Sequence, residues 1–238
     1  MMDIRNKVVL ITGASAGIGL ATVRCFAAAG AQLALVARSA DVLTHLAEEL
    51  QRQGVNAVAL SADVRDQDQV RRVIEDTVQH FGHLDVIINN AGQAAAGTIA
   101  NLNLDDFRTI LDLNVFGPWA AMQAVIPIMR EQGGGLIINV SSIVSKMHLP
   151  GLAAYAATKA ALNMLSDTAR AELASEHIRV ITVYPPLTAT DFGKNSLGDW
   201  HAHEQQRQHA PVPVHTPEFV AEKILTAALH EPDEQYMD

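Results

Sequence analysis

The stretch KVVLITGASAGIGLATVRCFAAAG occupies residues 7–30 and runs from an apolar segment, through a glycine-rich turn, into an alanine-rich helical pattern. The apolar segment at 7–12 shows no alternation of polar and apolar residues, which is typical of a β-strand buried on both faces. The pattern over 17–30 predicts an α-helix that ends at Gly30. A buried strand that leads directly into a helix indicates an α/β fold with a parallel sheet.

The turn between strand and helix, TGASAGIGL at 12–20, carries Gly13, Gly17 and Gly19. Glycines here permit a tight turn and a close approach of the backbone to a ligand, while the helix N-terminus offers N–H groups to a pyrophosphate. The spacing is G-x-x-x-G-x-G rather than the G-x-G-x-x-G of other dinucleotide folds. An ordinary loop that uses glycine is the alternative, but three glycines within seven residues favour a dinucleotide site.

The alternation of apolar runs and helical patterns continues along the chain. Further strands are expected at 31–37, 55–63, 84–92, 135–142 and 178–185. Further helices are expected at 40–53, 66–82, 104–131, 153–177 and 218–230. This order predicts one α/β domain over 1–238, with a doubly wound, Rossmann-like parallel sheet of six to seven strands and helices on both faces. Pro118 and Pro127 should each bend or interrupt the helix that contains them.

The amino-acid composition limits the classes of protein to which the chain could belong. The 238 residues are 49% hydrophobic, which suits a folded domain, and the net charge of −9 argues against nucleic acid as a partner. The single cysteine, Cys25, excludes an internal disulfide, and its apolar helical surroundings predict a place in the core. The N-terminus leads into a strand without a signal peptide, and no apolar stretch reaches the roughly 18 residues of a membrane span. We therefore expect a cytoplasmic protein with no membrane partner.

One segment departs from the alternating pattern. Residues 188–217 are polar, contain four of the ten histidines and lie between a strand and the last helix. A long irregular segment in a compact domain is usually a functional lid or is disordered, and we favour a substrate lid. The sequence HAH at 201–203 could be a metal pair, but no third ligand is evident, so solvated histidines and no metal site are expected.

The sequence YAATK at 155–159 places a tyrosine and a lysine four residues apart, near the start of an expected helix. Residues at this spacing share one helix face, and a cationic Lys159 would favour the phenolate of Tyr155 and lower its pKa. An unperturbed tyrosine titrates at about pH 10, too high for acid–base work at neutral pH, so the pair could be a tuned proton donor. The spacing could equally arise by chance.

Several motifs, taken together, carry a resemblance to a known family. The glycine turn, NNAG at 89–92, Asn114, VSS at 140–142 and YAATK resemble the compact single-domain branch of the short-chain dehydrogenase/reductase family. The likeness runs from about residue 5 to residue 190, in the family's order and spacing. It implies a catalytic tetrad of Asn114, Ser142, Tyr155 and Lys159.

The resemblance also implies a role for each member of the tetrad. Tyr155 would exchange a proton with a carbonyl oxygen as hydride moves to or from the nicotinamide, and Ser142 would orient that oxygen. Lys159 would lower the tyrosine pKa and hold the nicotinamide ribose. Asn114 would fix a water in a proton relay to Lys159, although it could instead cap a break in the helix.

Ser141 is the rival to Ser142 for the serine role. Strand alternation should point the two side chains to opposite faces, and the interval of 13 residues to Tyr155 favours Ser142. NVS at 139–141 matches a glycosylation signal, which we discount because it falls in a strand expected to be buried.

The end of the second strand indicates which dinucleotide is preferred. An acid there selects NAD through the ribose 2′-OH, whereas an arginine nearby accommodates the 2′-phosphate of NADP. Ala37 stands where the family's NAD enzymes have aspartate, and Arg38 and Ser39 follow it. We therefore predict NADP as the preferred cofactor, with NAD possible; the alternative is that Arg38 is a solvated surface charge.

The remaining cofactor contacts come from the resemblance. Asp63 and Val64 look like the family's adenine contacts, and in NNAG, Asn89 would brace the sheet while Gly92 lets the cofactor pass, unless the motif is only a strand end. The full set that the resemblance implies is Gly13, Ser15, Ala16, Gly17, Ile18, Gly19, Arg38, Ser39, Asp63, Val64, Asn90, Ala91, Gly92, Tyr155, Lys159, Pro185, Thr188 and Thr190.

Two places depart from the family pattern. The chain has Pro185–Pro186 where the family usually has Pro-Gly, and the second proline fixes φ and removes an N–H in the loop that would wrap the nicotinamide carboxamide. The C-terminal QYMD lacks the family's usual last strand, so a seventh strand could be stunted. The small residues over 155–173 suit close packing between subunits, so a homodimer or homotetramer is expected.

These observations predict an oxidoreductase that acts on a small carbonyl/alcohol substrate. Residues 143–154 should line the substrate side. Met147, Leu149 and Leu152 suggest a partly apolar substrate, although Lys146 and His148 blur that assignment. The rival is a dinucleotide-binding sensor or scaffold without turnover, which the complete tetrad disfavours. Sugar-nucleotide epimerisation on a related fold usually needs a larger C-terminal domain than this chain has room for.

Overall fold

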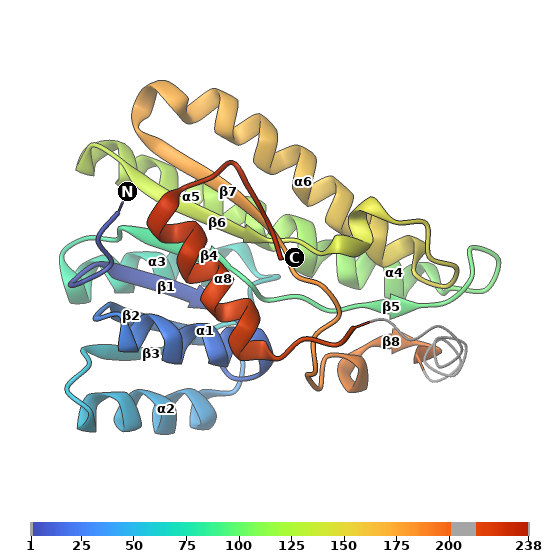
Figure 1. Ribbon diagram of the computed structural model, residues 1–238, viewed down its shortest axis with the longest axis horizontal. Coiled ribbons are helices and arrows are strands. Elements are labelled where there is room, and N and C mark those ends of the chain that lie inside the picture. Colours follow the sequence, from blue (N-terminus) through green and yellow to red (C-terminus); the bar gives the residue numbers. More distant parts are fainter. Residues whose placement is uncertain (1, 201–212, 238) are drawn as a thin grey trace.

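The computed structural model describes residues 2–200 and 213–237 of the chain. Its centre is a sheet of seven strands in the order β3-β2-β1-β4-β6-β7-β9, in which every neighbouring pair is parallel (Figure 1). The strands are β1 Val8–Thr12, β2 Gln32–Ala37, β3 Ala57–Ser61, β4 Val86–Asn89, β6 Gly135–Val140, β7 Ile178–Tyr184 and β9 Glu234–Tyr236. The predicted doubly wound parallel sheet is confirmed.

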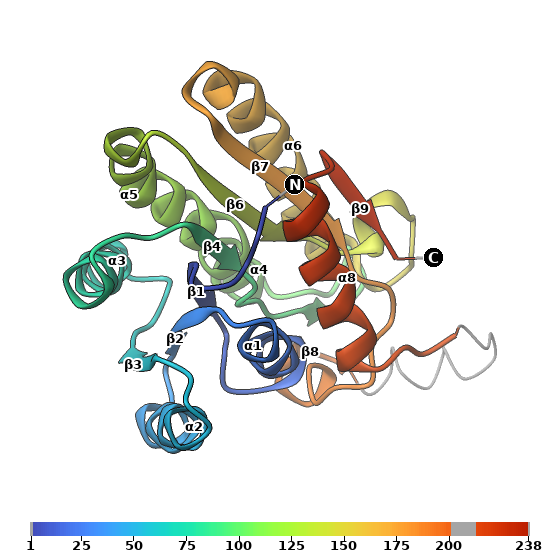
Figure 2. The same cartoon turned by 60° about the vertical axis from the view of Figure 1, so that its left-hand side comes forward.

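Helices cover both faces of this sheet, and each layer closes its own apolar core (Figure 2). One layer holds α1, α2 and α8, and the other holds α3, α5 and α6. The helices are α1 Gly17–Ala28, α2 Ala40–Arg52, α3 Gln67–Phe81, α4 Leu104–Leu111, the π-helical η1 Asp112–Phe116, α5 Gly117–Gln132, α6 Ala153–Leu173 and α8 Pro217–His230. Cys25, expected in the core, is only half-buried on α1, where burial raises the pKa of its thiol.

The order of the strands reverses at β1, and this point places the ligand site. β1 pairs with β2 on one side and with β4 on the other. The loops that leave β1 and β4 therefore turn toward opposite faces and open a crevice at the carboxyl ends of the strands. Ligands of open α/β sheets bind in that crevice.

The helix expected over 104–131 is divided into α4, η1 and α5. Pro118 stands in the first turn of α5, directly after the π-helical turn, and α5 continues through Pro127. Gly117 is required at the join, because a Cβ there would lie 2.9 Å from the carbonyl oxygen of Val64. Single π-helical turns inside α-helices are frequent at functional sites, and this one contains Asn114.

The described part of the segment 188–217 is fastened to the rest of the molecule. A two-residue strand, β8 (Leu197–Gly198), pairs with β5 (Ala95–Ala96), and a β-bridge between Thr188 and His215 joins the two ends of the segment to each other. The HAH sequence at 201–203 lies outside the described residues. Among those described, no group of three His, Cys, Asp or Glu side chains is arranged to hold a metal ion.

The seventh strand, β9, contains three residues and runs along the outer edge of β7. The expectation of a stunted last strand is thereby met. The rings of Tyr184 and Tyr236 stack at the end of this pair, with centroids 4.6 Å apart. Across residues 2–200 and 213–237, no helix combines the length and the apolar character that crossing a bilayer requires.

Candidate active site

Tyr155 and Lys159 lie one turn apart near the start of α6, beside the carboxyl end of β6. Tyr155 is buried, and the hydroxyl of Ser142 lies near enough to lower its pKa. The Lys159 ammonium donates a hydrogen bond of 2.8 Å to the Val140 carbonyl oxygen, and its nitrogen lies 6.0 Å from the centroid of the Tyr155 ring. The structure therefore brings together three of the four residues of the expected tetrad.

The pKa of Tyr155 shifts in the direction opposite to the one expected. Burial raises the pKa of Tyr155 to about 12, and the hydrogen bond with Ser142 only partly opposes this. Lys159 does not reverse the shift, because its nitrogen is engaged with the Val140 carbonyl and is itself buried, which lowers the pKa of Lys159 to about 8. The expectation that Lys159 lowers the pKa of Tyr155 below its ordinary value is therefore wrong.

The geometry distinguishes the two neighbouring serines. Ser141 turns inward, where its hydroxyl donates a hydrogen bond of 2.5 Å to Oδ1 of Asn163 on α6. Ser142 turns to the other side, where it meets Tyr155 and accepts a hydrogen bond of 3.2 Å from the Val144 N–H. Strand alternation separates the two as expected, and Ser142 lies beside the tyrosine.

Asn114 joins the π-helical turn to the segment after β4 and to α6. Its fully buried amide nitrogen donates to the Gln93 carbonyl at 2.8 Å and to the Thr158 hydroxyl at 3.0 Å. Its amide oxygen accepts from the Gln93 N–H at 3.0 Å. These bonds span separate elements, so the alternative of a simple helix cap does not describe Asn114. Gln93 and Thr158 were not anticipated from the sequence, although Thr158 lies inside the YAATK motif.

The glycine turn can be compact because its glycines carry no side chain. A Cβ on Gly19 would lie 2.0 Å from the carbonyl oxygen of Gly13, so only glycine permits α1 to approach the end of β1 this closely. Gly13 and Gly17 have φ of +69° and +53°, which glycine adopts without strain. At the start of α1, the cap residue Ala16 offers no side-chain hydrogen bond, and the first turn holds no acidic residue. These N–H groups and this space fit an anionic pyrophosphate.

A hollow of about 520 Å³ opens beside this helix start. It is lined by Ala16, Gly17, Leu20, Ala21, Arg24, Ala189, Thr190, Asp191, Pro217 and Glu218. A Cβ on Gly17 would lie 3.2 Å from the Thr190 methyl group, so the loop after β7 reaches the glycine turn. Three of the expected cofactor contacts, from opposite ends of the chain, thus surround one space.

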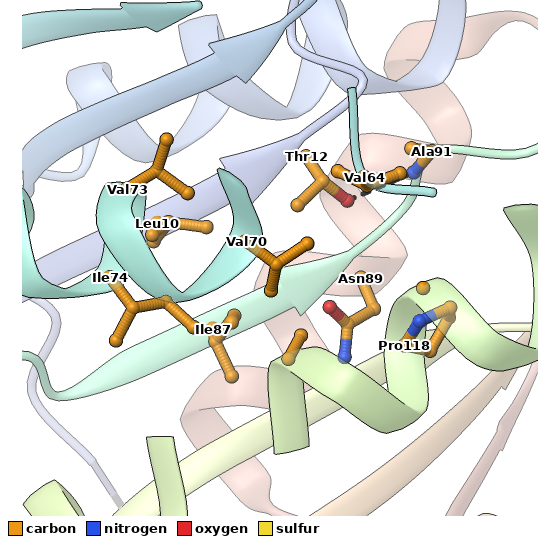
Figure 3. A pocket seen from close by; sticks show the side chains of 12 residues that line it. Leu10, Thr12, Val64, Val70, Val73, Ile74, Ile87, Asn89, Ala91 and Pro118 are labelled. Atoms are coloured by element: carbon orange, nitrogen blue, oxygen red, sulfur yellow. Dashed lines mark hydrogen bonds between the residues drawn. The ribbon is translucent and has the colours of Figure 1, made fainter. Parts of the chain in front are cut away.

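A second cavity, of about 10 Å³, lies inside the layer of α3 and α5 (Figure 3). Its lining is mostly apolar, with Leu10, Val70 and Ile87 around the side chain of Asn89. A space of this size is at the lower limit for one water molecule. It contains no member of the tetrad, and we assign it to imperfect core packing.

The NNAG motif is held by side-chain hydrogen bonds on both sides. Asn89 donates to the Asn139 amide oxygen at 2.8 Å, and Asn139 donates to the Ser166 hydroxyl at 2.8 Å, which links β4, β6 and α6. The Thr12 hydroxyl accepts hydrogen bonds from the N–H groups of Asn90 and Ala91. Asn89 thus braces the sheet as expected, and the motif is more than a strand end.

At the end of β2 and β3 the structure adds a residue that the sequence did not single out. The carboxylate of Asp63 accepts hydrogen bonds from the Arg65 guanidinium, which lowers the pKa of that carboxyl, and the charge of Arg38 acts in the same direction. Arg38 and Arg65 therefore both lie near Asp63, which was expected to contact adenine. The sequence signal for Arg65 was its place two residues after Asp63.

The unusual proline pair is accommodated without a disturbed strand. The Pro185 carbonyl accepts a hydrogen bond of 3.1 Å from the Ile143 N–H, which ties the end of β7 to the turn after Ser142. The Pro186 carbonyl accepts one of 2.9 Å from the Thr188 hydroxyl. Both carbonyl groups are therefore paired within the loop.

The chain is similar to known proteins in sequence and in fold. A family model described as short chain dehydrogenase matches residues 7–199. The chain is 38% identical over 195 residues to a 3-oxoacyl-[acyl-carrier-protein] reductase of Staphylococcus epidermidis, which covers 82% of this chain and 80% of that protein. L-Sorbose reductase from Gluconobacter frateurii, solved with NADPH and L-sorbose, aligns with a TM-score of 0.87 at 32% identity, over 100% of this chain and 97% of that one.

A solved short chain dehydrogenase/reductase from Burkholderia phymatum, in complex with NAD, reaches a TM-score of 0.91 at 22% identity, over 100% of this chain and 90% of that one. At this identity the likeness concerns the fold. The family match concerns the sequence as well as the fold, because residues 7–199 include the glycine turn and the tyrosine and lysine of α6. The chain belongs to the short-chain dehydrogenase/reductase family.

Proposed function

We propose that this chain is an oxidoreductase that interconverts a carbonyl compound and an alcohol, prefers NADP, and uses Tyr155 as general acid and base. The observation that carries the proposal is that Ser142 lies beside the buried Tyr155, with the buried Lys159 one turn further along α6. Two hydroxyl groups that lie side by side could both meet one carbonyl oxygen, which supports this reaction.

The chemistry follows from these side chains. When bound, the nicotinamide cofactor supplies or accepts the hydride at the reacting carbon of the substrate. In reduction, the Tyr155 hydroxyl gives its proton to the carbonyl oxygen while the Ser142 hydroxyl holds that oxygen, and hydride plus proton turn C=O into CH–OH. Because burial keeps the pKa of Tyr155 at about 12, the tyrosine carries its proton at neutral pH and is ready to act as an acid.

Lys159 can stabilise the negative charge that Tyr155 carries after it gives up its proton. The phenolate of Tyr155 would be buried, and an unpaired buried charge is unfavourable. With a pKa lowered to about 8, Lys159 is still mostly protonated at neutral pH and can stabilise the phenolate or return a proton toward it. Asn114 would assist by holding a water in a proton relay to Lys159, a role that rests on the family resemblance.

The preference for NADP rests on the end of β2. Ala37 leaves no carboxylate to bind a ribose 2′-OH, and Arg38 and Arg65 place positive charge near Asp63. A 2′-phosphate would gain from that charge. The L-sorbose reductase relative was solved with NADPH, which agrees with this choice, while NAD stays possible.

The proposal is tested by NADPH oxidation against a panel of ketones, aldehydes and diketones, with wild type beside Tyr155→Phe. We expect turnover to fall by about 10²–10⁴-fold in the variant, as for loss of a general acid. NADPH should still bind to the variant, which its fluorescence can follow. Tight NADPH binding in both proteins without turnover on any substrate would overturn the proposal and mark the chain as a dinucleotide sensor.

The segment 188–217 is proposed as a substrate lid on a single domain of residues 1–238, and a homodimer or homotetramer is proposed through α6. Along this helix, Ala153, Ala157, Ala160 and Met164 are exposed at helical spacing, and Met164 is 67% exposed. Light scattering should show a smaller assembly for Met164→Glu than for wild type. A cytoplasmic location belongs to the same proposal and rests on the single cysteine.

A further inference from the structure

A cluster of apolar side chains packs around Tyr155. Ala94 and Ala154 are buried in it with the tyrosine, and the half-buried side chains of Val144, Phe192 and Leu197 pack against it. The ring of Phe192 is tilted by 58° against the ring of Tyr155, with 5.8 Å between the centroids. An apolar side chain of the proposed lid therefore lies directly against the proposed acid.

Hydrogen bonds just C-terminal to Phe192 hold the stretch of chain that carries it. The Leu197 N–H donates to the Ala94 carbonyl at 2.9 Å within the pairing of β5 and β8. The side-chain amide of Gln93 donates to the Asn195 carbonyl, and Gln93 is in turn held by Asn114. The stretch that carries Phe192 is thus fastened to the same segment that follows β4 into the tetrad.

The charged residues near this cluster are engaged elsewhere. Asp191 and Lys194 pair with each other, and their side chains are 71% and 80% exposed. Lys146, in the turn after Ser142, lies 3.6 Å from Glu234. Among the described residues, Lys159 is the cation that lies near the Tyr155 ring, and its nitrogen donates to the Val140 carbonyl on the β6 side.

We infer that the substrate is an aldehyde or ketone with an uncharged, apolar body, and that Phe192 is the residue that selects it. This inference rests on the proposed function and deepens it. The carbonyl would meet the hydroxyls of Ser142 and Tyr155, while the apolar body would pack against Phe192 and its neighbours in the cluster. Each methylene buried there favours binding by about fourfold, whereas a carboxylate at the far end of the substrate would lose its hydration against these apolar side chains.

A matched pair of substrates tests the class. 2-Octanone and 7-oxooctanoate have the same carbon chain and the same methyl ketone, and differ in a terminal methyl or carboxylate. We expect kcat/KM for 2-octanone to exceed that for 7-oxooctanoate by about 100-fold. Equal values, or a preference for the carboxylate or for a polyhydroxy ketone such as fructose, would overturn the inference.

Substitution of Phe192 tests the residue. Phe192→Ala should raise KM for 2-octanone roughly tenfold with kcat little changed, because a buried apolar contact is lost. Acetone, which has no apolar chain to bury against the ring, should lose much less than 2-octanone, and Phe192→Leu should keep most of the wild-type KM. An equal loss for acetone and 2-octanone in Phe192→Ala would show a merely structural role and overturn the assignment.

Binding without turnover separates this inference from the proposed function. Calorimetry with Tyr155→Phe should rank 2-octanone above 7-oxooctanoate, whether or not the wild type reduces either compound. No turnover with this ranking intact would overturn the proposed reaction and leave the apolar site standing. Turnover that Tyr155→Phe abolishes, together with the reverse ranking, would confirm the reaction and overturn the apolar class.

Discussion

The glycine turn and the tetrad are built by different means. The turn is shaped by main chain, since the Gly13 carbonyl fills the place that a side chain on Gly19 would need. The tetrad is held by side chains, since Asn114 bonds to two other segments and Lys159 to the end of β6. Substitutions in the turn should therefore damage the fold and cofactor binding together, whereas substitutions in the tetrad should damage chemistry and leave the fold in place.

The largest effect is expected for Gly19→Ala. The new Cβ would lie 2.0 Å from the Gly13 carbonyl oxygen, so α1 or the end of β1 must move. We expect the free energy of unfolding to fall by at least about 3 kcal/mol and NADPH binding to be lost. Urea unfolding and NADPH fluorescence measure the two effects.

Gly54→Ala is the matched control for this prediction. Gly54 has a positive φ of +84°, whereas Gly19 lies in the helical backbone of α1, and a Cβ on Gly54 would meet nothing within 4 Å. Only the backbone strain remains, about 1 kcal/mol, and NADPH binding should be unchanged. If both variants lose similar stability and both bind NADPH, close approach at Gly19 does not shape the site.

The second effect belongs to the tetrad and depends on pH. Burial lowers the pKa of Lys159 from 10.5 to about 8, so above pH 8 the folded chain loses this proton before the unfolded chain does. Between these values the unfolded chain binds more protons, and stability rises with pH, by up to about 3 kcal/mol from this group. The stability of wild type relative to Lys159→Met should therefore increase from pH 8 to pH 10.5.

Urea unfolding of wild type and Lys159→Met at several pH values between pH 8 and pH 10.5 measures this difference in stability. Groups that titrate alike in both proteins cancel in the difference. At neutral pH, Lys159→Met should unfold with wild-type cooperativity while turnover falls by about 10²-fold or more, because the tyrosine phenolate loses its cation. A stability difference that stays flat from pH 8 to pH 10.5 would contradict a lowered lysine pKa.

The sequence was most informative where structure is local. The glycine turn, the strands and the YAATK pair each depend on residues close together in the chain, and all of them lie where expected. Pro127 shows the limit of a local rule, because α5 continues through it in an exposed position. The direction of the Tyr155 pKa could not be predicted, because it depends on burial by segments far away in the sequence, including the one that carries Phe192.

The contacts that sequence reasoning missed join common residue types across long intervals. Gln93 binds Asn114, and Lys146 approaches Glu234, with nothing in either sequence neighbourhood to announce the pair. Arg65 is different, because its interval to Asp63 is short and the two could have been paired from the sequence. Local motifs thus predict which residues form the site, but only the fold shows which side chains hold them in place.

The third effect is expected at the cofactor end, where a side chain rather than main chain selects the ligand. Arg38→Ala should weaken NADPH binding by roughly 10–100-fold and leave NADH binding unchanged, because only NADPH carries the 2′-phosphate. Fluorescence titration with both cofactors measures this. Arg71→Ala removes an exposed arginine that pairs with Asp68 and serves as the control for overall charge. An equal loss for both cofactors in Arg38→Ala would make Arg38 a surface charge.

The smallest effect is expected at the C-terminal strand, where Glu234 accepts a hydrogen bond from the Tyr184 hydroxyl and lies 3.6 Å from Lys146. Glu234→Gln keeps an acceptor for Tyr184 and loses only a partly exposed charge, so it should lower stability by less than about 1 kcal/mol. Thermal unfolding measures this, with Tyr236→Phe as the control for the weaker hydrogen bond of the cluster. Turnover should stay within about twofold of wild type, because Glu234 touches the turn after Ser142 and none of the tetrad. If Glu234→Gln lost as much turnover as Lys159→Met at unchanged stability, the side chains that hold the tetrad in place would include Glu234, near the C-terminal end of the described chain.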